Sequence, residues 1–238
     1  MIRTIVLAAA GRGTRMKHLA QNHSKHLVEI AGRPFFYYTL SSIRAAGFQR
    51  IIVVVGHHAA RMREFLSSLP YPVEVVDQAE VVGEKYGTAS VVEAARHSIG
   101  EQSFVYQMGD WVYTPEVYAP LRVEDGFCRA SSMPYQVPHQ FGIVEQKNGW
   151  LKRIVEQSSE PGTYEINNAL YSFTPAIFPA IDAVVPSPRG EYEIPDAINA
   201  LAAQHLVKVV SLPAGAGIEL GKPEDLPLVE QFIQEHFS

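Results

Sequence analysis

Cysteine is almost absent from the 238-residue sequence, which holds Cys128 alone, so the chain can form no internal disulfide. Such a composition is typical of reducing compartments, and we expect a cytoplasmic protein. No apolar run is long enough to span a membrane, and residues 1–11 are interrupted too early by glycine and charge to form a signal peptide. These absences predict a globular protein that has no membrane partner.

An excess of basic residues is also missing. Lysine and arginine together number 20 against 25 aspartates and glutamates, and the resulting net charge of −5 argues against a nucleic-acid-binding surface. The sequence has no internal repeat, low-complexity tract or linker-like change of composition. Because 47% of its residues are apolar, it can bury one substantial core, and we expect a single domain over residues 1–238.

Strand-length apolar runs alternate with helical patterns in the first half of the chain, which predicts parallel strands flanked by helices. The expected strands are residues 2–7, 50–55, 73–77 and 103–108, and the expected helices are residues 34–46, 59–69 and 88–98. The second half predicts strands, mostly antiparallel, at 127–133, 141–146, 150–156, 166–173 and 207–212, with helices near 175–183, 194–203 and 223–236. Asn148-Gly149 indicates a tight hairpin. Ligands of such sheets bind beyond the carboxyl ends of the strands.

A glycine-rich turn follows the first predicted strand. Gly11 and Gly13 would let backbone N–H groups approach anionic oxygens, and Arg15 and Lys25 follow within reach of a nucleotide held there. Met16 replaces the third glycine of the dinucleotide-binding pattern, and no Walker-type phosphate loop is present. The turn therefore predicts a phosphate cradle of another design.

Two further positions each have two interpretations. Asp110 follows a predicted buried strand and suits Mg²⁺, although an aspartate beside a glycine is also common in turns. Gly87-Thr88 opens a predicted helix whose N-terminus could hold a phosphate or a base edge, although threonine is also an ordinary N-cap residue. The residues alone leave both interpretations open.

Taken in order, motifs spread over nearly the whole chain resemble those of the sugar-1-phosphate nucleotidylyltransferases. The most specific motif is the N-terminal Gly-x-Gly-Thr-Arg-Met loop, and the other motifs follow in the family's order. They begin at Gly11, Lys25, Gly32, Gly87, Gly109, Phe141, Ile154, Asn168, Gly190 and Leu220. The resemblance implies an α/β protein with a three-layer α/β/α, Rossmann-like nucleotidyltransferase fold and a mixed, mainly parallel central sheet.

The resemblance also implies residue roles. Arg15 would hold the β- and γ-phosphates, Lys25 the α-phosphate, and Asp110 a catalytic Mg²⁺. Glu219 stands where many relatives carry a second metal-binding aspartate, and it is equally open to interpretation as a solvated surface residue. The nucleotide would contact Ala9, Ala10, Gly11, Gly13, Thr14, Gln78, Gly87 and Thr88, and the acceptor would contact Gly142, Glu156 and Asn168. Residues 1–110 would then form a nucleotide-binding half and residues 111–238 an acceptor-binding half.

Several positions depart from the family pattern. Ser24 replaces a proline before the lysine, Gln157 replaces a lysine that commonly meets the acceptor phosphate, and Leu170 replaces a frequent glycine. His26 and the other histidines near Lys25 have no metal-binding spacing and are expected at the surface, with a secondary phosphate contact left open. Residues 108–113 also resemble the inositol-phosphate cytidylyltransferases.

The implied reaction moves an NMP from an NTP onto a sugar-1-phosphate, with Mg²⁺ as cofactor and pyrophosphate as the second product. The attacking phosphate oxygen is already anionic, so the reaction needs charge neutralisation and in-line placement rather than a general base. Two alternatives stay open: a cytidylyltransferase acting on a cyclitol or other alcohol phosphate, and a non-catalytic nucleotide sensor. The expected partners are an NTP and a small phosphomonoester, and homo-oligomer formation is left open.

Overall fold

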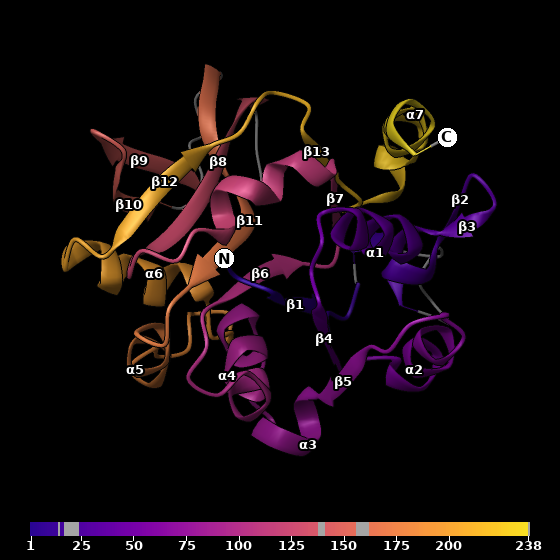
Figure 1. The fold of residues 1–238 in the computed structure, drawn as a ribbon, viewed down its shortest axis with the longest axis horizontal. Helices are drawn as coiled ribbons and strands as arrows, with labels where there is room; N and C mark the ends of the chain where they lie inside the picture. Colours follow the sequence, from indigo (N-terminus) through magenta and orange to yellow (C-terminus); the bar gives the residue numbers. More distant parts are fainter. Residues whose placement is uncertain (14, 17–23, 138–140, 156–161, 238) are drawn as a thin grey trace.

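A nine-stranded sheet runs through the middle of the protein (Figure 1). The computed structural model describes residues 1–13, 15–16, 24–137, 141–155 and 162–237. From edge to edge the strands are β5 (Glu74–Asp77), β4 (Arg50–Val55), β1 (Thr4–Ala9), β6 (Phe104–Met108), β11 (Gly162–Phe173), β8 (Cys128–Val137), β12 (Val207–Ser211), β10 (Trp150–Val155) and β9 (Ile143–Lys147).

The first four of these strands run parallel, as predicted. β1 pairs with β4 on one side and with β6 on the other, so that Ala9 lies opposite Val55 and Ala8 opposite Met108. All six residues of β1 are buried, which explains why the sequence shows a continuous apolar run instead of alternation. Because the strands are in register, their carboxyl ends reach the same edge of the sheet, where the glycine-rich turn begins.

The strands after Met108 continue the same sheet in mixed directions. β11 runs antiparallel to β6 and β8, β12 runs parallel to β8, and β10 runs antiparallel to β12 and β9. The predicted hairpin between β9 and β10 is confirmed. Asn148 and Gly149 have φ values of 53° and 77°, the positive values that a two-residue turn between antiparallel strands favours.

Helices cover both faces of the sheet. They are α1 (Phe35–Ala45), α2 (Ala59–Ser67), α3 (Gln78–Val82), α4 (Thr88–Ile99), α5 (Ile177–Asp182), α6 (Ile194–Ala203) and α7 (Leu226–His236), with 3₁₀ segments η2 (Lys25–Leu27), η3 (Pro115–Arg122) and η4 (Pro223–Asp225). Val6 and Ala8 of β1 pack in the core that contains α4, α5 and α6, whereas Ile5 and Leu7 pack with α1, α2 and η3. Alternate residues thus supply two apolar layers, and the predicted α/β/α architecture is confirmed.

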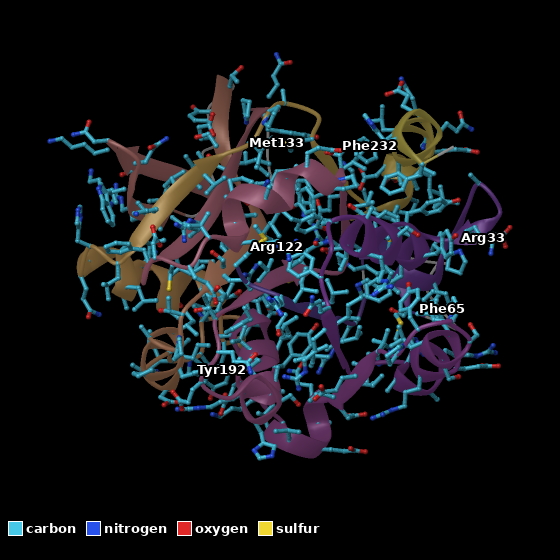
Figure 2. The ribbon with its side chains drawn as sticks, viewed as in Figure 1. Arg33, Phe65, Arg122, Met133, Tyr192 and Phe232 are labelled. Atoms are coloured by element: carbon cyan, nitrogen blue, oxygen red, sulfur yellow. The ribbon has the colours of Figure 1, made fainter. Side chains whose placement is uncertain are left out.

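A third, smaller core lies under α7, which Figure 1 shows beside α1. Phe232 of α7, labelled in Figure 2, belongs to this core together with Phe35 of α1. Met16 is fully buried there, at the end of the glycine-rich turn. Its burial ties that turn to the C-terminal helix, far away in the sequence.

Two short strand pairs were not predicted. β2 (Glu29–Ile30) pairs with β3 (Arg33–Pro34), and β7 (Trp111–Tyr113) pairs with β13 (Gly217–Glu219). A Cβ at Gly217 would lie 2.2 Å from the Tyr113 ring, so this position has room only for glycine. The second pair begins directly after Asp110 and brings the C-terminal part of the chain to the carboxyl end of β6.

Among the described residues, no helix is both long enough and apolar enough to cross a bilayer.

Candidate active site

The ends of β1 and β6 are held together by the backbone. The amide of Gly109 donates a hydrogen bond of 2.9 Å to the carbonyl oxygen of Ala8. A Cβ at Gly109 would lie 2.6 Å from that oxygen, so a larger residue would push the two strand ends apart. The glycine therefore sets Asp110, the next residue, beside Ala9 and Ala10 at the edge of the sheet.

Asp110 and Lys25 form a nearly buried ion pair. The Nζ of Lys25 donates a hydrogen bond to Oδ2 of Asp110, and the two side chains are 11% and 6% exposed. The other carboxylate oxygen, Oδ1, is buried and has no hydrogen-bond partner among the described residues. A buried, unpaired carboxylate oxygen is costly unless a ligand completes it, which makes this atom a candidate contact for a cation.

The charge state of Asp110 follows from its surroundings. Burial alone would raise its pKa, but the positive charge and hydrogen bond of Lys25 outweigh that effect and hold the pKa below its ordinary value. The carboxylate is therefore ionised at neutral pH, as cation binding requires.

Glu219 is the second carboxylate of the site. It lies opposite Trp111 in the β7–β13 pair, and the amide of Leu220 donates a 2.8 Å hydrogen bond to the carbonyl oxygen of Asp110. Burial and the negative charge of Asp110 raise the pKa of Glu219 to about 7. Such a shift is expected for two carboxylates that share a confined space. The Glu219 side chain is 14% exposed, so the alternative that it is a solvated surface residue is wrong.

Arg15 adds a second cation at the outer side of this group. Its guanidinium lies 3.6 Å from Oε1 of Glu219, and the side chain is 54% exposed. Arg15, Lys25, Asp110 and Glu219 thus form one group, although they come from three distant parts of the sequence.

The carboxylates fit a divalent cation of the magnesium type. Mg²⁺ commonly takes one or two protein carboxylates and fills its remaining positions with water and substrate phosphates. The described residues contain no group of three or more histidine, cysteine, aspartate or glutamate side chains that could enclose a metal. The orphaned Oδ1 of Asp110 and the neighbouring Glu219 match the open kind of site rather than an enclosed one.

The glycine-rich turn lies next to this corner. Gly13 has φ +63°, and its carbonyl oxygen accepts a 2.9 Å hydrogen bond from the amide of Met16. No atom of the described residues lies within 4 Å of where a Cβ of Gly11 would stand, which leaves room for a ligand to approach the backbone there. Thr14, which the resemblance assigned to the nucleotide, lies outside the described residues.

The residues expected to contact the nucleobase lie where residues 78–88 pack against residues 192–194. Gln78 is buried, and its Nε2 donates a 2.9 Å hydrogen bond to the carbonyl oxygen of Lys85. A Cβ at Gly87 would lie 2.4 Å from the carbonyl oxygen of Tyr192. The hydroxyl of Thr88 accepts a 2.8 Å hydrogen bond from the amide of Ile194, the first residue of α6. The hydroxyl of Thr88 therefore accepts a hydrogen bond from the first backbone amide of α6 and does not cap α4. Neither sequence interpretation predicted this arrangement.

Two of the three expected acceptor residues are described. The carbonyl oxygen of Gly142 accepts a 2.7 Å hydrogen bond from the amide of Asn167. Asn168 is fully buried, and its Oδ1 accepts a hydrogen bond from Ser131, while its Nδ2 has no partner among the described residues. Glu156 lies outside the described residues. The roles of Gly142, Glu156 and Asn168 at an acceptor stay predictions.

His26 differs from its expected position. It is 2% exposed, and its Nδ1 lies 2.6 Å from the hydroxyl of Ser24, which replaces the family's proline. Burial, with a further effect of Lys25, lowers the pKa of His26 to about 3, so the ring is neutral. The expectation of a surface histidine is wrong, and a neutral buried ring cannot act as a cationic phosphate contact. No local sequence signal marks this burial, because it arises from packing against Phe36 and Gly109.

Comparisons with known proteins cover almost the whole chain. The sequence profile of the family described as nucleotidyl transferase matches residues 3–236. The chain is 31% identical to the low-salt glycan biosynthesis nucleotidyltransferase Agl11 of Haloferax volcanii, over 98% of this chain and 66% of that protein. It is 26% identical to the UTP–glucose-1-phosphate uridylyltransferase AglF of the same organism, over 97% of this chain and 96% of that protein.

A glucose-1-phosphate thymidylyltransferase of Streptomyces griseus is 30% identical over 82% of this chain and 56% of its own length. The chain therefore spans between about half and nearly all of the length of these relatives. Among solved structures, the inositol-1-phosphate CTP transferase of T. maritima superposes with a TM-score of 0.82 at 16% identity, covering 98% of this chain and 96% of that one. A UDP-glucose pyrophosphorylase complexed with UDP-glucose also reaches 0.82 at 18% identity, covering 99% of each chain. Both structures share the fold.

Proposed function

The chain belongs to the nucleotidyl transferase family, and on that premise we propose that it transfers an NMP from an NTP onto a sugar-1-phosphate, releasing pyrophosphate and forming an NDP-sugar. Relatives whose names specify uridylyl or thymidylyl transfer to glucose-1-phosphate support this reaction class. The observation that carries the proposal is the group of Arg15, Lys25, Asp110 and Glu219 at the carboxyl edge of the sheet. Two cations beside two carboxylates suit a reaction between two anionic substrates.

The proposed step is an in-line displacement at the α-phosphorus of the NTP. An oxygen of the acceptor phosphate forms the new P–O bond, and the bond between the α-phosphorus and the bridging oxygen breaks, so that the electron pair leaves with pyrophosphate. No proton must be removed, since the attacking oxygen is already anionic. Lys25 would neutralise the α-phosphate and Arg15 the leaving pyrophosphate.

We propose Mg²⁺ as the cofactor, held by Asp110 and Glu219. When bound, it would supply positive charge to the phosphates during the transfer. Lys25 already shares Oδ2 of Asp110, which leaves the orphaned Oδ1 for the cation. Glu219, whose pKa lies near neutrality, would be ionised more fully beside a divalent cation.

We also propose that the two groups of substrate contacts lie on different parts of one domain. Residues 1–110 would bind the nucleotide through the turn after β1, and residues 111–238 would bind the acceptor near Gly142 and Asn168. The pairing of β6 with β11 joins the two parts in one sheet, which suits a reaction that needs two substrates at a fixed separation.

The test is pyrophosphate release in the presence of Mg²⁺ for UTP, dTTP, CTP, GTP and ATP, each combined with hexose-1-phosphates, hexosamine-1-phosphates and inositol phosphate. We expect one or a few pairs with a sugar-1-phosphate to react, and product analysis should show the NDP-sugar. Turnover with CTP and inositol phosphate alone would replace the proposal by the cytidylyltransferase alternative. NTP binding without turnover for any acceptor would favour a nucleotide sensor.

A further inference from the structure

A contact across the glycine-rich turn involves Arg12 and Tyr86, two residues to which the sequence analysis assigns no role. The backbone amide of Arg12 donates a 3.2 Å hydrogen bond to the hydroxyl of Tyr86. The guanidinium of the same arginine lies over the tyrosine ring, 4.7 Å from its centroid. We call this double contact the Arg12–Tyr86 clasp. It joins segments that are 74 residues apart and that were both expected at the nucleotide.

The backbone around Tyr86 is anchored from two sides. Its carbonyl oxygen accepts a 2.8 Å hydrogen bond from the amide of Tyr192, and the carbonyl oxygen of Lys85 accepts one from Gln78. Gly87 packs so closely on Tyr192 that it has no room for a side chain. Tyr192 itself is labelled beside α4 in Figure 2. These backbone contacts therefore fix the position from which the Tyr86 ring reaches the turn.

The other end of the clasp lies between the two glycines of the turn. Gly11 has no described atom within 4 Å of its Cβ position, and Gly13 adopts the left-handed conformation, so neither glycine contributes side-chain packing that would hold the shape of the turn. The hydroxyl of Tyr86 accepts the hydrogen bond from the amide of Arg12. The neighbouring amides of the turn are then the ones that would donate hydrogen bonds to phosphate oxygens. Tyr86 directly precedes Gly87, and Lys85 before it is hydrogen-bonded to Gln78, so the tyrosine belongs to the segment that carries the residues expected at the nucleotide.

We propose that the Arg12–Tyr86 clasp forms one wall of the nucleoside site and holds the glycine-rich turn ready for the triphosphate; this inference rests on the proposed function. Aromatic rings and guanidinium planes both stack on nucleobases, and the stacking tolerates different bases because every base has a π-face. A turn that is ordered before the nucleotide arrives also binds it more tightly, since less conformational freedom is lost on binding.

The test compares Tyr86→Phe, Tyr86→Leu and Arg12→Ala with the unchanged protein. NTP affinity is measured by calorimetry without acceptor, and KM for the NTP and for the acceptor is measured in the pyrophosphate assay. Tyr86→Phe keeps the ring and should raise the NTP Kd roughly three- to tenfold through the lost hydrogen bond. Tyr86→Leu and Arg12→Ala should raise it about tenfold or more, because the stacked pair is lost as well. The acceptor KM should stay within about twofold.

Tyr71 offers a matched control, since it lies under Arg44 at 4.8 Å, away from the glycine-rich turn. Tyr71→Leu should leave the NTP Kd unchanged. Melting temperatures without ligand show whether each variant is folded, and if Tyr86→Leu unfolds, Tyr86→Phe and Arg12→Ala decide the question. The proposal is overturned if the folded Tyr86 variants bind the NTP as tightly as the unchanged protein, or if the acceptor KM rises equally. An unchanged protein that binds NTP but never turns over would refute the proposed function and leave the clasp testable by Kd.

Discussion

Lys25 and Asp110 are 85 positions apart in the sequence, yet they share a corner with little access to water. Their attraction there is much less screened than that of a surface pair, and it keeps Asp110 ionised against the effect of burial. Removing either residue would leave the charge of the other buried without a partner, and such a charge strongly destabilises the folded protein. One substitution at this pair should therefore affect both the reaction and the stability.

Lys25→Ala should lower kcat on the order of hundreds-fold, because the cation that we propose to neutralise the α-phosphate is lost. It should also lower the free energy of unfolding of the ligand-free protein by about 3 kcal/mol, since Asp110 remains buried without its partner. Steady-state kinetics and urea unfolding measure the two effects. Lys152→Ala, which removes a lysine that is 67% exposed, should change neither kcat nor stability by a comparable amount. A Lys25→Ala variant with kcat within tenfold of the unchanged protein would contradict the assigned role.

At the scale of elements, two short strands decide where the second carboxylate lies. β7 and β13 are three residues each, and neither would be stable alone. They pair because Tyr113 packs against the bare backbone of Gly217, and because the site end of β13 is tied to Asp110 through the amide of Leu220. The position of Glu219 in the proposed metal site thus depends on a small sheet, whereas that of Asp110 depends on the large one.

Gly217→Ala should therefore disturb the site from a distance. The added Cβ would lie 2.2 Å from the Tyr113 ring, and relieving that overlap should cost about 1–3 kcal/mol of stability and shift Glu219. We expect an unfolding midpoint at lower urea and a higher Mg²⁺ requirement in the pyrophosphate assay. Gly126→Ala is the control, since no described atom lies within 4 Å of a Cβ at that position and its φ of +83° is what opposes a side chain. It should cost about 1 kcal/mol and leave the Mg²⁺ requirement unchanged.

Asp125 links the start of β8 to β12 through Arg129 and Lys208. Partial burial would raise its pKa, but the hydrogen bonds from Lys208, Arg129 and the amide of Phe127 lower it to about 2. A carboxylate whose pKa is lower in the folded than in the unfolded state stabilises the fold above pH 4, and this contribution is lost as the pH falls towards 2.

Asp125→Asn should consequently destabilise the protein at pH 7 by about 1 kcal/mol, a value reduced by the solvent exposure of the group. The difference from the unchanged protein should shrink between pH 4 and pH 2, which unfolding curves over that range would show. Asp182→Asn removes a carboxylate that is 51% exposed and should have a smaller effect. A destabilisation by Asp125→Asn that is equal at pH 2 and pH 7 would rule out the charge as its cause.

At the scale of the whole molecule, one continuous sheet carries both groups of expected substrate contacts. β6 ends at Met108, two residues before Asp110, and it pairs with β11, which contains Asn168. A ligand bound at the end of β1 and β6 therefore stabilises strands that both halves share. Binding should be visible as a change in the global stability rather than as a local event.

An NTP with Mg²⁺ at about 100 times its Kd should add about 2.7 kcal/mol to the free energy of unfolding. For a chain of this length, that corresponds to a rise in melting temperature of about 5–10 °C. Thermal scans with and without a chelator test the expectation, and Asp110→Asn should remove most of the rise. A rise of equal size in the Asp110→Asn variant would show that this carboxylate does not take part in nucleotide and metal binding.

The sequence by itself determined the features that depend on neighbouring residues. The continuous apolar runs of β1, β4 and β6 predicted buried parallel strands, and Asn148-Gly149 predicted its hairpin, because burial on both faces and turn geometry each leave a local pattern. The glycine-rich turn and the order of the motifs predicted the family, since backbone approach to phosphate demands glycine at given positions.

Only the tertiary structure decided which distant residues meet. Strands as short as β7 and β13 have too few residues for a recognisable period, so the local pattern did not place Glu219 near Asp110, and only the family resemblance had suggested it. The burial of His26 and the bond from Ile194 to Thr88 likewise arise from packing between separate elements. The pKa values of Asp110 and Glu219 follow from the same packing, because desolvation and charge proximity depend on distances in space and not on separation along the chain.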